Sequence, residues 1–177
     1  MKTETIMWLF PIVFIIHDFE EIIMMSPWVK KNAGFLAHRF PLMAARMLPH
    51  LEGLSTSSFA LAVALMFLIV SAVTLICVEF GLYALWAGAL IGFFVHLVVH
   101  VGQFLVVGRY VPVVITSLVT APYCIWALIV IDSRHPLPVG ETIIWTAATV
   151  VVIAVALPLA HILAGRFQRW LQGRYGA

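Results

Sequence analysis

A run of ionisable side chains interrupts an apolar segment near the start of the chain. His17, Asp18, Glu20 and Glu21 fall within five residues. Each charged side chain near the centre of a bilayer costs about 2.5–3.5 kcal/mol, so such a cluster requires compensation. On a helix, Glu20 lies about 60° to one side of His17 and Glu21 about 40° to the other. The imidazole and both carboxylates therefore share one helix face, with Asp18 at its edge.

Two further histidines have the spacing of neighbouring ligands on one helix. His96 and His100 are one helical turn apart, and Gln103, Gly92 and Gly88 extend the same face as a polar or small stripe. Gly88 and Gly92 form a small-xxx-small pair, which lets another helix approach closely. This stripe is expected to face protein rather than lipid.

The five groups are predicted to form one metal site in the cytoplasmic half of a membrane. Their depths agree within about two helical turns if both helices run inward. Imidazole and carboxylate ligands together suit a divalent transition metal, with zinc or iron expected first. The predicted ligands are His17, Glu20, Glu21, His96 and His100.

The carboxylates that are not needed as ligands suggest catalysis. A metal lowers the pKa of bound water towards about 7, and a nearby carboxylate can take its proton and pass it to a leaving group. Glu20 and Glu21 are thus the candidate catalytic residues of a metal-dependent hydrolase acting on a lipid or other amphipathic substrate. Three alternatives stay open: iron-dependent oxidation of a lipid, a non-enzymatic carrier of metal ions or protons, and a metal-free polar core that fixes helix register.

Composition requires the helices that carry these residues to lie in a bilayer. Of the 177 residues, 63% are hydrophobic and 10% are charged, whereas a soluble domain has about 25% charged residues. A net charge of +2 is too weak for a nucleic-acid binder. We expect a single all-α integral-membrane domain over residues 1–177. Five apolar runs are long enough to cross a membrane, at 6–25, 59–78, 82–107, 111–131 and 142–163.

The segment 26–58 is the only long connection between these runs. Pro27, Pro41 and Pro49 are expected to break it into short helices. Its mixture of bases and large apolar side chains predicts helices that lie in the membrane interface, or alternatively a lid over a cavity that faces the cytoplasm.

The distribution of basic residues predicts the orientation. All lysines and arginines except Lys2 and Arg134 fall in segment 26–58, in the turn after the third run or in the carboxyl-terminal tail. Because short basic loops stay in the cytoplasm, five spans place the amino terminus outside and the carboxyl terminus inside. The expected location is the bacterial inner membrane.

The run from His17 to Glu21 resembles the HXXEE-motif family of small bacterial membrane proteins. That family is described as having a further histidine, here His96 or His100, and a Tyr-x-Pro-Gly element. Tyr110-Val111-Pro112 agrees with this element, and Val113 stands in place of its glycine. The resemblance covers most of the chain and implies no particular activity, because the family is known chiefly as one of unknown function.

Overall fold

The computed structural model describes residues 1–53 and 55–176, and its elements are helices joined by short connections. This confirms the predicted all-α class. The helices are α1 (Thr3–Arg39), α2 (Pro41–Gly53), α3 (Thr56–Phe80), α4 (Tyr83–Val107), α5 (Val114–Arg134) and α6 (Val139–Tyr175).

Four helices, α3 to α6, are long and apolar enough to cross a membrane. They contain most of the last four predicted spans, and large apolar side chains stay exposed along them, such as Leu105 at 71% and Val151 at 63%. An apolar surface of this kind suits a lipid environment. The predicted count of five spans is not confirmed. The first predicted span, 6–25, lies within α1, which is not among the four helices because three acidic residues interrupt its apolar stretch.

The prediction that prolines divide segment 26–58 into short pieces was wrong at two of three positions. Helix α1 continues through Pro27 to Arg39, and Pro49 lies inside α2. Only Pro41 marks a boundary, at the first residue of α2, where the fixed φ of proline suits the start of a helix. Beyond Pro27, α1 continues because Val29, Asn32 and Leu36 are buried at helical spacing, and their packing outweighs the loss of one backbone hydrogen bond.

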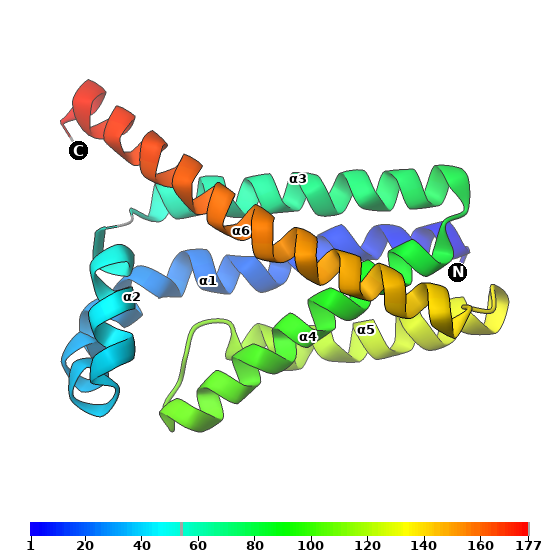
Figure 1. Cartoon of the computed structure of the whole chain (residues 1–177), viewed down its shortest axis with the longest axis horizontal. Helices are drawn as coiled ribbons and strands as arrows, with labels where there is room; N and C mark the ends of the chain where they lie inside the picture. The colour runs from blue at the N-terminus through cyan, green and yellow to red at the C-terminus, as the bar shows by residue number, and fades with distance from the viewer. Residues whose placement is uncertain (54, 177) are drawn as a thin grey trace.

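Helix α1 lies among the other helices and packs against α2, α3, α4 and α5, whereas α6 crosses diagonally over α3 and α4 (Figure 1). The amino terminus, the α3–α4 turn and the α5–α6 connection lie at one end of the molecule (Figure 1). Helix α2, the α4–α5 connection and the carboxyl terminus lie at the other. The basic segments thus share one end, as the sequence predicts; the orientation relative to a membrane stays a prediction.

The aromatic core joins the first half of α1 to α4. The ring of Phe10 meets Trp86 edge-on at 6.0 Å between centroids and Phe93 at 5.6 Å. The free thiols of Cys77 and Cys124 are buried in the same core and pack as small apolar groups. This core fixes α1 against α4 about two turns before the candidate site.

Close packing of α4 against α6 depends on the two glycines that the sequence singled out. A Cβ atom on Gly88 would lie 2.7 Å from the carbonyl carbon of Trp145, and one on Gly92 would lie 2.9 Å from Cγ2 of Thr149. A methyl group on Gly88 would require the backbone of α6 to move, and one on Gly92 would require at least the Thr149 side chain to move. The predicted small-xxx-small contact is therefore confirmed, and it brings α6 over the face of α4 that carries His96.

Candidate metal centre

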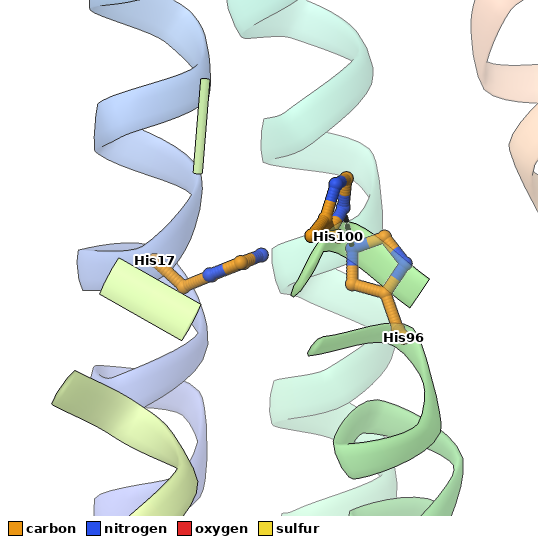
Figure 2. Close-up of side chains that lie close together, drawn as sticks. All are labelled: His17, His96 and His100. Atoms are coloured by element: carbon orange, nitrogen blue, oxygen red, sulfur yellow. Dashed lines mark hydrogen bonds between the residues drawn. The ribbon is translucent and has the colours of Figure 1, made fainter. Parts of the chain in front are cut away.

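Three histidines from two helices converge. His17 comes from α1, and His96 and His100 come from adjacent turns of α4. One ring nitrogen from each lies within 4.8 Å of the others, and the Nε2 atoms of His96 and His100 are 2.9 Å apart. Figure 2 shows the ring of His17 directed across the gap between the helices toward the other two. Three nitrogens in tetrahedral coordination at metal distances of about 2.0–2.1 Å lie about 3.3 Å apart, so only small side-chain adjustments are needed to hold an ion.

The Nε2 atom of His17 is the buried group that most needs a partner. His17 is fully buried, and this nitrogen has no hydrogen bond to any residue that the structure describes. A buried polar atom without a partner costs about 1–3 kcal/mol. Coordination of a metal ion would remove that cost, because it uses the lone pair that points at the other two imidazoles.

The Nδ1 atoms of His100 and His17 have partners that orient the rings. Nδ1 of His100 lies 3.0 Å from Oε1 of Gln103. An amide oxygen only accepts, so Nδ1 of His100 carries the hydrogen and Nε2 keeps its lone pair. Nδ1 of His17 lies 3.3 Å from Oγ1 of Thr116. Hydrogen bonds of this kind, from the far nitrogen of a ligating imidazole, set the tautomer that a metal requires.

Glu20 forms its hydrogen bonds with Thr116 and Tyr110 rather than with the other two histidines. Its Oε2 accepts hydrogen bonds from the Thr116 hydroxyl at 2.7 Å and the Thr116 amide at 2.8 Å. Its Oε1 accepts one from the Tyr110 hydroxyl at 2.6 Å. Since the Thr116 hydroxyl donates to Glu20, its oxygen is free to accept from Nδ1–H of His17. Glu20 therefore orients His17 through one hydroxyl group and joins α1 to the start of α5.

Tyr110 serves as a neutral donor in this group. Burial raises its pKa, and the hydrogen bond to Glu20 and the negative charge of that carboxylate raise the pKa further. The backbone around it is held by the second half of α1. Nε1 of Trp28 donates to the Tyr110 carbonyl at 2.6 Å, and the Arg109 guanidinium lies over the ring of Phe35 at 4.0 Å.

The Tyr-Val-Pro-Val turn adopts the conformation that a glycine would favour. Val113 has a φ of 70°, the only positive φ of a non-glycine residue in the described chain. This left-handed conformation is strained for a β-branched residue. The side chain is buried, and the carbonyl of Val113 accepts from both the amide and the hydroxyl of Ser117, at 2.8 and 2.7 Å. The position at which the family element has glycine is thus the position where the backbone requires one.

Glu21 and Asp18 face away from Glu20, toward a cavity. Glu20 and Glu21 lie on opposite sides of His17 around the helix. Because the histidines of α4 lie in front of His17, the two glutamates fall on either side of this contact and have different surroundings. Asp18 is 5% exposed and Glu21 is half-buried. Neither carboxylate has a hydrogen bond to a residue within the described ranges.

The cavity has a volume of about 620 Å³ and is bounded by α1, α2, α3, α4 and α6. Its walls are mostly apolar, with contributions such as Met47 from α2, Met66 from α3 and Leu157 from α6. Its few polar lining residues are Asp18, Glu21, His96, His100, Gln103 and His161. Two of the three converging histidines, His96 and His100, thus line the cavity, and His17 contacts them from the side away from it.

Of the five predicted ligands, the structure brings together the three histidines and separates the two glutamates from each other. Sequence reasoning did not select Thr116, and a threonine in an apolar helix carries no signal that could have identified it. Tyr110 had a signal in the Tyr-x-Pro element of the resemblance. His161, far along α6, donates through Nδ1 to the Leu157 carbonyl at 2.8 Å.

Comparison with known proteins agrees with the motif. A family model described as "Protein of unknown function with HXXEE motif" matches residues 8–127. This match includes the three histidines, both glutamates and the Tyr110 turn. No curated protein and no solved structure gives a significant match to the chain. Because the family model covers most of the sequence, the chain belongs to the HXXEE family of proteins of unknown function.

Proposed function

We propose that this protein is a membrane-embedded, metal-dependent hydrolase whose substrate is a lipid or another amphipathic molecule. The observation that carries the proposal is the convergence of three imidazole nitrogens at a cavity wall, one of them buried without a partner. A site with three histidines leaves a further coordination position open, as in catalytic zinc sites. Zinc is the expected metal, and iron would favour oxidation instead.

The proposed reaction divides the work between the metal and Glu21. The metal would lower the pKa of a bound water towards about 7 and polarise the substrate carbonyl. Glu21 accepts the proton as the water oxygen bonds to the carbonyl carbon. It then delivers this proton to the leaving atom, the alcohol oxygen of an ester or the amine nitrogen of an amide, as the bond to the carbonyl carbon breaks. Glu20 takes no part in the proton transfer, because its oxygens already accept from Tyr110 and Thr116.

The cavity supports an amphipathic substrate. Apolar walls with a few polar groups at one position suit a ligand that has an alkyl chain and a reactive head. The chain would lie among the methionine and leucine side chains of α2, α3 and α6. The head would then reach His96 and His100.

Metal content is the first test. Protein purified in a non-ionic detergent without chelators is compared by elemental analysis with His96→Gln, His100→Gln and, as a matched control, His161→Gln. We expect a stoichiometric transition metal in the wild type and in His161→Gln, and loss of metal from the other two variants. Wild-type protein that holds no such metal even after expression with added zinc or iron would refute the proposal.

Activity is the second test. The metal-loaded protein is incubated with acyl esters and amides of short and long chains, and released fatty acid is measured. We expect hydrolysis that depends on chain length and falls by about 10²–10⁴-fold in Glu21→Gln, with metal content unchanged. Equal activity of this variant and the wild type would exclude Glu21 as the proton acceptor.

A further inference from the structure

We propose that Asp18 binds the head group of the cavity's ligand, and that this ligand is an amphiphile with an amine in its head. The inference deepens the proposed function and rests on it in one respect, since both place the ligand in the same cavity. It concerns recognition rather than chemistry and can be tested without a metal.

The Asp18 carboxyl group is buried but has no hydrogen-bond partner among the described residues, although buried polar groups normally have one. It is 5% exposed, lines the cavity and forms no hydrogen bond with the part of the chain that the structure describes. Burying a carboxyl group without a partner is among the costlier arrangements in a protein. A carboxylate so placed, with its oxygens at a cavity wall, is explained most directly by a ligand that donates hydrogen bonds to it.

The charges around the cavity select the sign of that ligand. Asp18 and Glu21 lie one turn apart on α1, and no lysine or arginine is found among the described residues that line the cavity. The other polar lining groups are three imidazoles and one amide. A fatty-acid carboxylate or a phosphate head would be buried beside two acidic side chains, with no lysine or arginine in the described lining to pair with it. An ammonium group would instead donate up to three hydrogen bonds to them.

The position of Asp18 relative to the histidines suggests how the ligand lies. Asp18 is about 100° around α1 from His17, and Glu21 is about 40° from His17 on the same side. An amine held by Asp18 would therefore lie beyond Glu21 as seen from the histidines. The bond to be cleaved would then be a short distance from the amine, with the alkyl chain along the apolar wall.

The test compares three amphiphiles of the same chain length: dodecylamine, dodecanol and dodecanoate. Each is added at equal mole fraction to protein in a non-ionic detergent, and native mass spectrometry measures the fraction of protein that retains it. The proteins are the wild type, Asp18→Asn and Glu79→Gln, the last removing an exposed carboxylate at the far end of α3 as a control. The metal-deficient variant His96→Gln is measured alongside.

We expect wild type and Glu79→Gln to retain the amine at least about tenfold better than the carboxylate, and Asp18→Asn to lose this preference. Equal or better retention of dodecanoate by the wild type would overturn the inference, as would an unchanged amine preference in Asp18→Asn. If Asp18→Asn does not fold, the wild-type comparison of the three amphiphiles still decides. An amine preference that persists in His96→Gln supports the inference even if the metal proposal fails.

Discussion

The two neighbouring glutamates of the HXXEE motif have different partners, because consecutive residues of an α-helix point about 100° apart. Glu20 turns toward the start of α5, where Thr116 and Tyr110 donate to it. Glu21 turns toward the cavity and keeps its oxygens free of protein donors among the described residues. The motif thus combines a histidine of the candidate metal centre, a glutamate that orients this histidine and a glutamate that faces the cavity.

Thr116→Val should weaken metal binding without altering the fold. The change keeps the shape and the backbone amide of Thr116 but removes the hydroxyl between His17 and Glu20. Loss of such an orienting contact typically lowers metal affinity about 10–100-fold. Competition with a fluorescent zinc chelator, followed until the signal is constant, measures the effect, and Thr116→Ser, which keeps the hydroxyl, serves as the control. Affinity in Thr116→Val equal to that of the wild type would show that the hydroxyl does not orient His17.

Tyr110→Phe should lower thermal stability at neutral pH, because Glu20 loses a donor. A hydrogen bond to a charged group contributes about 1.5–3 kcal/mol, and the partial exposure of Tyr110 favours the lower end. Since the folded protein raises the pKa of Tyr110, the bond's contribution is complete below the ordinary value of 10.0 and decreases as pH rises above it. Melting temperatures of the wild type and the variant should therefore differ at pH 7 and converge in strong alkali. A constant difference across this range would contradict the assignment.

At this scale the sequence allowed prediction of the histidines but not of their surroundings. Spacing alone placed His96 and His100 on one face, and the estimated depth of His17 agreed with theirs. The partners of Glu20 depend on the path of the chain between α4 and α5, which no periodicity encodes. Thr116 becomes important only because the strained turn at Val113 brings the first turn of α5 against α1.

Among the elements, the contact between α4 and α6 determines one wall of the cavity. Two glycines on α4 let the backbone of α6 approach, and this packing holds α6 over His96. Helix α6 buries few of its own side chains, with Ala160 and Ala164 the buried residues described on it. These two alanines pack against Ala62, so α3 holds the second half of α6 as the glycine contact with α4 holds the first.

Two alanine substitutions within α4 should have opposite effects on stability. Gly88→Ala places a methyl group against the backbone of Trp145, and overpacking of this kind costs about 1–3 kcal/mol. Gly102→Ala meets nothing within 4 Å and should stabilise the helix by about 0.5–1 kcal/mol, because alanine loses less conformational freedom. Thermal unfolding in detergent measures both. A Gly88→Ala variant as stable as Gly102→Ala would mean that α6 does not pack as described.

The predicted span 142–163 covers only part of α6, which extends from Val139 to Tyr175. The ends of α3 and α4 were predictable because their uninterrupted apolar runs end at turn residues, Gly81 and Gly108. Both adopt a positive φ and end their helices, which is the usual role of glycine after a helix. The length of α1 was not predictable, since Pro27 signals a break when read locally. Packing of Val29 and Leu36 against other helices overrides that signal, and such tertiary contacts are absent from the local pattern.

At the scale of the whole molecule, α1 packs against three of the four helices that are long and apolar enough to cross a membrane, α3, α4 and α5. One face of its first half is buried in the core, with Ile6 and Met7 at 0% exposure, and the opposite face exposes apolar side chains such as Ile12 at 51%. Of its acidic side chains, Glu20 meets hydrogen-bond donors and Asp18 and Glu21 face the cavity, so the surrounding helices cover these three. We expect α1 to be the fifth span.

The two termini should accordingly lie on opposite sides of the inner membrane, with the carboxyl terminus in the cytoplasm. Fusion of a reporter that is active only in the cytoplasm to one terminus, and of a reporter active only outside to the other, tests this. Four spans without α1 would place both termini on one side. That result would contradict the five-span arrangement and the assigned depth of the histidines.

The complete burial of His17 also affects how quickly an ion can come and go. From the cavity, a metal would reach the three nitrogens past His96 and His100, along mostly apolar walls that offer little replacement for the water that an ion must shed. Exchange should therefore be slow compared with ordinary handling of the protein. The ion would then enter while the helices assemble, so the metal available in the cell during synthesis would determine which ion the mature protein carries.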